Sequence, residues 1–179
     1  MLNNIKIGVK LIVAFLLVSS ITALVGYLGI TNMSDINDEA DKLYSAELMG
    51  LSYIKEANTN LVNIGRALRN SVLSNTQDDK NKFIDATDGF SKLLQKNIDL
   101  AKPLLLTQDG KELYGQFAKE WSKYQLGLEK ALDLIRSESL SENKGSVSFI
   151  QQELRTTADQ VDELLTQLSD LKAQNAKDA

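Results

Sequence analysis

Arginine is the residue type in this sequence best suited to bind an anion, and two of the four arginines lie close together. Arg66 and Arg69 are three residues apart, so in a helix they occupy neighbouring positions on one face. Neither has an acidic residue three or four positions away that could pair with it within the helix. A guanidinium group is planar and donates two parallel hydrogen bonds to a carboxylate. The pair therefore favours an external anion as its partner.

Polar side chains flank this pair and recur near the end of the chain. Asn63 and Asn70 lie beside the two arginines in the sequence. Counting residues from the predicted turns places several polar residues of the last helical segment at about the same distance from the end of the bundle as the two arginines. These residues are Gln151, Gln152, Arg155, Thr156 and Thr157. A hydroxyl at a core heptad position, as at Thr157, needs a hydrogen-bond partner. Such a set suits a small organic acid or an amino acid, and the predicted ligand site comprises Arg66, Arg69, Asn70, Asn63, Gln152, Arg155, Thr156 and Thr157.

Other interpretations of these side chains stay open. The arginines could be solvated, or they could pair with acids from another helix, which is common for surface arginines. Trp121 and Tyr124 lie at core spacing and are expected to pack, although either could form the wall of a pocket. Thr87 is a polar residue at a core-facing position, and it could likewise either pack in the core or line a pocket.

The composition excludes most catalytic chemistry. The 179 residues include no Cys and no His, so a zinc site, an iron–sulfur cluster, a thiol nucleophile and a catalytic triad are all excluded. Acidic pairs such as Asp78 and Asp79 are typical of helix starts. We therefore expect no enzymatic activity, no metal and no cofactor. A formal net charge of −4 argues against a nucleic-acid partner, whose phosphates require a basic face.

The N-terminal region contains an uncharged apolar segment long enough to cross a membrane. Residues 11–30 carry no charge, and twenty helical residues cover ~30 Å, the thickness of the hydrocarbon core. Lys6 and Lys10 precede this segment and acidic residues follow it, which predicts a cytoplasmic N-terminus. The expected organisation is a cytoplasmic N-terminus, a transmembrane helix and an exported sensor region, at residues 1–10, 11–30 and 31–179.

A cleaved signal peptide and a buried helix of a soluble protein are the alternatives for this segment. A signal peptide has a shorter apolar region followed by a cleavage site of small residues, whereas this apolar run continues past Ala23 to Ile30. A soluble helix is seldom apolar on all sides over such a length. We therefore interpret the segment as an uncleaved membrane span.

The rest of the chain has the pattern of amphipathic helices. One Pro and ten Gly leave few helix breakers, and apolar residues recur at intervals of three and four. A first helix that continues from the span, helices at about 78–105 and 109–137, and a fourth after a capped turn at 139–142 are expected. Short connections predict an all-α fold, in which the transmembrane helix continues into an up-down-up-down antiparallel four-helix bundle.

The core positions of the first helix follow the same spacing. A row of residues at intervals of three and four is expected to face a partner helix, and this row is called the seam: Leu51, Ile54, Asn58, Leu61, Gly65, Leu68 and Val72. Asn58 and Gly65 weaken it, because neither supplies an apolar side chain. The fourth helix would return toward the bilayer, so we expect a second span and a cytoplasmic output region after residue 179. The alternative is a single-span protein with a helical ectodomain.

Three stretches resemble bacterial methyl-accepting chemotaxis proteins. IKIGVKLIVAF at residues 5–15, followed by VGYLGI at 25–30 and Met33, resembles the start of these receptors. NIGRALRNSVL at 63–73 is similar to the Arg-x-x-Arg-Asn stretch in the first helix of their sensor bundle. FAKEWSKY at 117–124 is similar to a stretch of their third helix. The resemblance extends over the whole chain.

This resemblance implies a homodimeric periplasmic sensor in the bacterial inner (plasma) membrane that binds a small attractant or repellent. Its fourth helix would transmit a small displacement to a cytoplasmic region that controls a chemotaxis kinase through an adaptor. In the amino-acid receptors, Arg of the first helix and Thr of the fourth hold the ligand across the dimer interface, which implies such roles for Arg66, Arg69 and Thr156 or Thr157. Here the first helix has two arginines where those receptors have three.

Similar bundles also precede histidine kinases and cyclases, which is one alternative to the chemoreceptor interpretation. The other alternative is a membrane-anchored helical interaction protein with no small ligand. A glutamate-rich coiled hairpin downstream would indicate a chemoreceptor, and a kinase core would indicate the first alternative.

Overall fold

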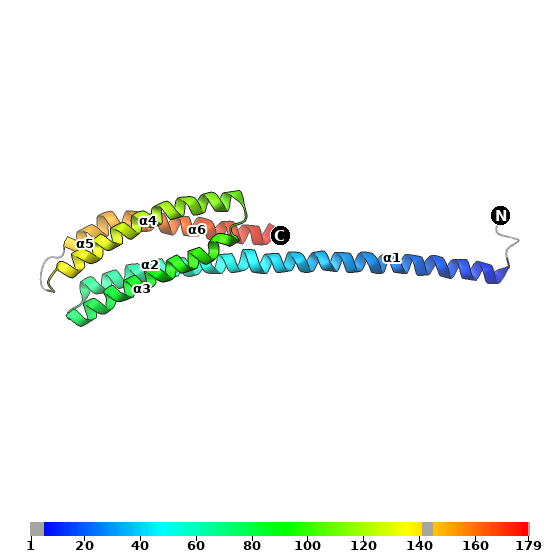
Figure 1. Ribbon diagram of the computed structural model, residues 1–179, viewed down its shortest axis with the longest axis horizontal. Helices are drawn as coiled ribbons and strands as arrows, with labels where there is room; N and C mark the ends of the chain where they lie inside the picture. Colours follow the sequence, from blue (N-terminus) through cyan, green and yellow to red (C-terminus); the bar gives the residue numbers. More distant parts are fainter. Residues whose placement is uncertain (1–5, 141–144, 179) are drawn as a thin grey trace. The chain divides into compact units, whose positions relative to one another are not determined.

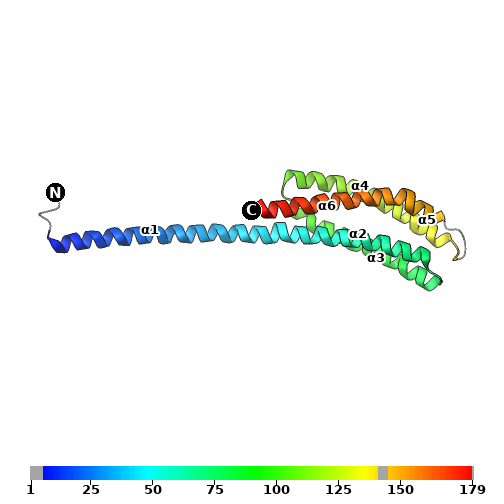
Figure 2. The same ribbon diagram turned by 180° about the vertical axis from the view of Figure 1, so that it is seen from behind.

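The computed structural model describes residues 6–140 and 145–178 (Figures 1 and 2). Within these ranges the secondary structure is helical and no strand occurs, which confirms the predicted all-α class. The second half of the turn predicted at 139–142 lies outside the described residues. The chain divides into two compact units, residues 1–42 and 43–179, and each is described by itself.

The first unit consists of the helix α1 (Ile7–Lys42), which buries none of its side chains. The hydroxyls of Ser20 and Thr22 donate hydrogen bonds to the carbonyls of Leu16 and Val18, at 2.8 Å and 2.9 Å. These bonds satisfy the polar groups of an otherwise apolar segment. In the described part of the chain, one helical run, Ile7–Leu73, is long and apolar enough to cross a membrane. Its N-terminal part is therefore a candidate membrane span.

The second unit is a bundle of four antiparallel helical rods, as predicted. A π-helical segment, η1 (Leu43–Leu48), comes directly before α2, with no loop residue between α1 and α2. The remaining elements follow in chain order: α2 (Met49–Leu73), α3 (Gln77–Ala101), η2 (Lys102–Leu104), α4 (Gln108–Ser137), α5 (Gly145–Phe149), η3 (Ile150–Leu154) and α6 (Arg155–Asp178). Helix α2 packs along α3, and α4 packs along the rod formed by α5, η3 and α6. Contacts between α2 and α6 join the two helix pairs.

Local sequence signals set the helix ends. The Thr76 hydroxyl accepts a hydrogen bond from the backbone N–H of Asp79 at 3.1 Å and caps α3. The Thr107 hydroxyl accepts one from Gly110 at 3.2 Å and caps α4. Each cap satisfies a backbone donor that the first helical turn leaves free. Pro103 lies in η2, a 3-10 turn, because its ring cannot continue the α-helix.

The core confirms the prediction that Trp121 and Tyr124 of α4 pack. Phe117, Trp121 and Tyr124 are buried, and their neighbouring ring centroids are 6.3 Å and 5.5 Å apart. The seam predicted for α2 is only partly correct, because Ala57 and Ile64 are fully buried where Asn58 and Gly65 were expected. The reason is that α2 packs against both α3 and α6, so it buries a wider face than a seam for one partner.

Candidate functional site

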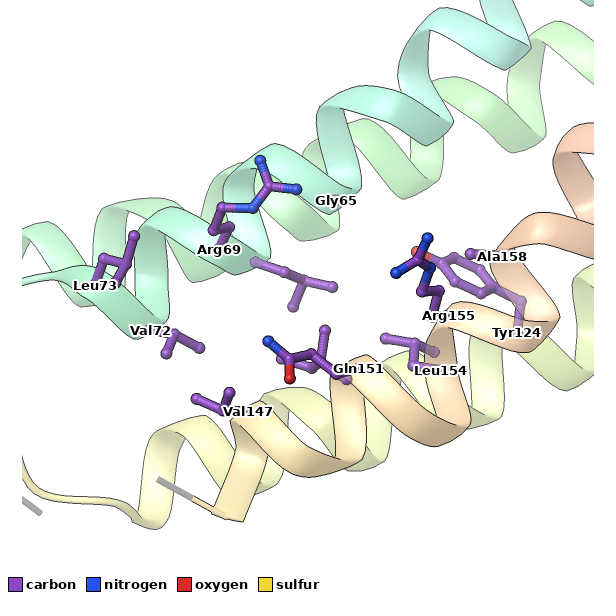
Figure 3. A pocket seen from close by; sticks show the side chains of 12 residues that line it. Gly65, Arg69, Val72, Leu73, Tyr124, Val147, Gln151, Leu154, Arg155 and Ala158 are labelled. Atoms are coloured by element: carbon purple, nitrogen blue, oxygen red, sulfur yellow. The ribbon is translucent and has the colours of Figure 1, made fainter. Parts of the chain in front are cut away.

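A cavity of about 670 Å³ lies between α2, α4 and the rod of α5, η3 and α6 (Figure 3). Its lining residues come from 65–73 of α2, from Tyr124 of α4, and from 147–158 of the last rod. The volume falls within the roughly 300–1,000 Å³ that is typical of small-molecule sites. One wall includes the π-helical segment η3, and such segments often occur at functional sites.

Most of the cavity wall is aliphatic. Helix α2 contributes three aliphatic side chains and the last rod contributes four: Leu68, Val72, Leu73, Val147, Ile150, Leu154 and Ala158. Leu68 and Leu154 are 1% and 3% exposed, whereas Leu73 is 67% exposed. The cavity therefore runs from an open side to an apolar floor that belongs to the core.

Two arginines line the cavity from different helices. Arg69 extends from α2, and Arg155 extends from the opposite wall at the start of α6 (Figure 3). The Arg69 side chain has no hydrogen bond or ion pair with any residue in 6–140 or 145–178. The Arg155 Nε atom is 3.7 Å from a carboxylate oxygen of Asp159, and both side chains are more than 70% exposed. An exposed pair of this kind contributes little, so both guanidinium groups are accessible to an anion.

Tyr124 places a polar group at the cavity. The residue is 2% exposed, and Figure 3 shows its ring pointing from α4 toward the cavity. Burial raises the pKa of its hydroxyl well above the ordinary value, because the phenolate would lose its hydration. The hydroxyl is therefore neutral at physiological pH, and it has no hydrogen-bond partner among the residues that the structure describes.

Gly65 leaves open space beside the cavity. It lies in the interior of α2 and is one of the lining residues. A Cβ atom built on Gly65 would meet no atom within 4 Å apart from its chain neighbours and the adjoining backbone of its own helix. Glycine in a helix interior costs about 0.5–1 kcal/mol relative to alanine, and packing at this position does not require it. The missing side chain enlarges the cavity.

The structure brings together two of the eight residues predicted for the site, Arg69 and Arg155. The other six do not line the cavity: Arg66, Asn63, Asn70, Gln152, Thr156 and Thr157. The Arg66 Nη1 atom is 3.5 Å from the Asn63 Oδ1 atom on the same helix. The hydroxyls of Thr156 and Thr157 donate to the carbonyls of Gln152 and Leu154, at 3.3 Å and 2.9 Å. The partner expected for the Thr157 hydroxyl is thus its own helix backbone.

Ten of the twelve lining residues were outside the predicted residue set, although Gln151 belongs to the polar group from which that set was drawn. Gln151 lies one position before Gln152 and lines the cavity. Val147 and Ile150 follow the heptad pattern of the core but are only partly buried, because α2 and α4 leave space beside them. The sequence signal that could have indicated this space is Gly65, a residue without a side chain at a predicted core position.

The polar groups of this cavity are chemically suited to an anion. The described residues contain no group of three or more Asp, Glu, His or Cys side chains that could hold a metal ion. Arg69, Arg155 and the neutral Tyr124 hydroxyl supply hydrogen-bond donors, and the aliphatic wall supplies apolar contact area.

Comparison with known protein families connects the chain to sensory proteins. Residues 4–179 match a family described as a four helix bundle sensory module for signal transduction. None of the curated proteins matches the chain, and none of the solved structures does.

Proposed function

The chain belongs to the family of four-helix-bundle sensory modules for signal transduction, and we propose that it is the ligand-sensing part of a bacterial membrane chemoreceptor. In this proposal, a small anionic ligand binds the bundle in the periplasm. Its binding displaces a helix, and the displacement is transmitted across the membrane. The proposal draws on the candidate span in α1 and on the cavity in the bundle.

The observation that carries the proposal is that the arginines lining one cavity come from two different helices. Arg69 belongs to α2 and Arg155 to α6. A carboxylate bound to both guanidinium groups would connect the two helices that join the halves of the bundle. Among the residues that the structure describes, no carboxylate pairs with both arginines: Arg155 lies 3.7 Å from Asp159, and the Arg69 side chain has no ion pair. A ligand thus has a physical reason to favour one arrangement of α2 and α6 over another.

Signal transmission needs a ligand that binds two helix arrangements with different affinities. Every residue from Ile7 to Leu73 is helical, so α2 and the candidate span belong to one helical run. Helix α6 ends the described chain at Asp178. We propose that a shift of α6 relative to α2 is the output, and that a downstream cytoplasmic region conveys it to a chemotaxis kinase and its adaptor.

Location and assembly are part of the same proposal. The two lysines before the span favour an N-terminus in the cytoplasm and a bundle in the periplasm or outside the cell. We further propose that the receptor works as a homodimer. Cross-linking of the full chain in membranes would test this, and a monomer at all concentrations would contradict it.

The ligand proposal is tested by thermal unfolding of the full chain in lipid nanodiscs with organic acids and amino acids. A binding ligand raises the melting temperature, because it binds only the folded state. Arg69→Ala and Arg155→Ala should each abolish the shift. Arg136→Ala is the control, because Arg136 pairs with Asp133 at 3.1 Å and does not line the cavity. A flat response across the panel would overturn the ligand-binding role.

A further inference from the structure

The placement of charge in the cavity restricts the class of anion that fits. Both cationic groups are exposed to solvent, and the Arg155 side chain is 74% exposed. The most buried wall residues are Leu68 and Leu154, which are aliphatic, and Tyr124, which carries one hydroxyl. A second carboxylate or an ammonium group placed against this floor would lose its hydration and gain at most the Tyr124 hydroxyl as a partner, which is costly. One end of the ligand is therefore charged and the rest is apolar.

The volume of the cavity favours a ligand body larger than a short polar chain. The cavity holds about 670 Å³, and a Cβ atom added at Gly65 would have no other atom within 4 Å. An apolar group that enters this space leaves water and contacts aliphatic side chains, which contributes roughly 25 cal/mol per Å² buried. A small hydrophilic acid would leave most of the wall in contact with water.

Tyr124 supplies a ring face as well as a hydroxyl at the cavity. Its ring stacks on Trp121 at a centroid distance of 5.5 Å, and Trp121 stacks on Phe117 at 6.3 Å. A planar ligand ring against Tyr124 would extend this aromatic column, and such ring pairs stabilise beyond their buried area. The neutral hydroxyl could also bond one uncharged polar atom of the ligand.

We infer that the cavity takes a monocarboxylate with an apolar body, either aromatic or branched aliphatic, in preference to a dicarboxylate or a polar amino acid. The carboxylate lies between Arg69 and Arg155, and the body lies against the aliphatic floor, Gly65 and Tyr124. This inference rests on the proposed ligand-sensing function and names the ligand class for that site.

The direct test compares four acids on the full chain in lipid nanodiscs. Phenylacetate and 3-methylbutanoate represent the inferred class, and succinate and aspartate represent hydrophilic acids. Titration calorimetry measures affinity. Fluorescence of Trp121, the single Trp in the chain, reports binding next to Tyr124. We expect the two apolar acids to bind at least about tenfold more tightly than the two hydrophilic ones. Phenylacetamide, the neutral analogue, should bind on the order of tenfold more weakly than phenylacetate.

A cavity-filling variant locates the apolar body. Gly65→Leu places a side chain in the open space and should weaken phenylacetate binding by about tenfold or more. Gly89→Leu is the matched control, because Gly89 is an exposed glycine of α3 that also has no atom within 4 Å of its Cβ position and lies outside the cavity. Ala158→Leu fills the cavity from the opposite wall and serves if Gly65→Leu does not fold. Circular dichroism verifies the fold of each variant.

The outcomes separate this inference from the proposed function. Tight binding of phenylacetate that Gly65→Leu weakens and Gly89→Leu leaves unchanged supports the inference. If succinate or aspartate binds more tightly, and Arg69→Ala abolishes that binding, the ligand class is wrong and the sensing function stands. Equal phenylacetate binding by Gly65→Leu, Ala158→Leu and the native chain also overturns the inference. If none of the four acids, nor any other anion of the thermal-unfolding panel, binds, the inference and the proposed function both fail.

Discussion

The ammonium group of Lys172 lies 3.0 Å from the carboxylate of Glu47, and only 1% and 10% of the two side chains reach solvent. The pair connects η1, the first element of the bundle unit, with α6, the last. Lys172 also donates a hydrogen bond to the backbone carbonyl of Leu104, the last residue of η2. Three parts of the chain that are far apart in sequence thus meet at one buried cation. The interaction ties the end of the last rod to the beginning of α2.

Removal of either partner of this pair should destabilise the bundle strongly. Lys172→Ala leaves the Glu47 carboxylate buried without a counter-ion, and Glu47→Ala leaves Lys172 with the Leu104 carbonyl alone. Breaking a buried pair in this way costs about 3–5 kcal/mol. Urea unfolding of the full chain in nanodiscs, followed by circular dichroism, measures the free energy. Arg136→Ala, which breaks an exposed pair, should cost less than about 1 kcal/mol. Comparable losses for the buried and the exposed pair would contradict the role assigned to Lys172.

Replacement of glycine by alanine should change the free energy of unfolding in opposite directions at two positions of α2, Gly50 and Gly65. A Cβ atom at Gly50 would lie 2.8 Å from the Cε atom of Lys172, whose ammonium group is held by Glu47. Gly50→Ala should therefore reduce the free energy of unfolding. Gly65→Ala adds a methyl group to open space and should increase it by about 0.5–1 kcal/mol, because alanine favours the helix. Urea unfolding of both variants measures the two signs, and a stabilised Gly50→Ala would show that Lys172 moves freely.

Arg69 and Arg66 should differ in their effect on ligand binding although they are neighbours on one helix. Arg69 lines the cavity, and its side chain has no hydrogen-bond or ion-pair partner in the described part of the chain. Arg66 lies outside the lining, with its Nη1 atom 3.5 Å from Asn63 Oδ1. We expect Arg69→Ala to weaken an anionic ligand by roughly 1.5–3 kcal/mol. Arg66→Ala should change the affinity little. Calorimetric titration of both variants decides between them, and a larger loss at Arg66 would favour the residue set predicted from sequence.

Tyr124 should make the bundle sensitive to alkaline pH. Burial raises the pKa of the Tyr124 hydroxyl above its unfolded value of about 10. The folded state therefore holds this proton more tightly, and the resulting stability is complete below about pH 10 and is lost as the pH rises above it. Tyr124→Phe removes this contribution, so its free energy of unfolding should fall less steeply than that of the native chain. Urea unfolding from about pH 8 to about pH 11, a range that brackets the unfolded pKa, measures the two slopes. Parallel slopes would indicate that the hydroxyl ionises freely in the folded bundle.

The orientation of the chain is testable because it contains no native Cys. Ser139 is exposed just after the end of α4, and Ile7 is exposed at the start of α1. In intact cells that express the full chain, Ser139→Cys should react with a membrane-impermeant maleimide. Ile7→Cys should react only after the cells are permeabilised. The reverse pattern would place the bundle in the cytoplasm and exclude a periplasmic sensor.

The positions of the helices could be predicted from the sequence because they depend on local physics. Apolar spacing, the capping residues Thr76 and Thr107, and Pro103 act within one or two turns of the chain. The helix expected at 109–137 is found at Gln108–Ser137. The packing of Trp121 and Tyr124 was predicted for the same reason, since their spacing places them on one face of this helix.

The site depended on distances between helices, which local patterns do not contain. Arg66 and Arg69 look equivalent in the sequence. Residues three apart on a helix, however, point in directions that differ by about 60° around its axis, and of these two arginines only Arg69 lines the cavity. Because α2 packs against both α3 and α6, Ala57 and Ile64 are fully buried, whereas Asn58 is only partly buried and Gly65 lies beside open space. The sequence alone therefore determined an all-α chain with an apolar N-terminal segment and four rods. The tertiary structure decided which arginines share a cavity and that Lys172 and Glu47 meet, because both depend on how the rods pack against one another.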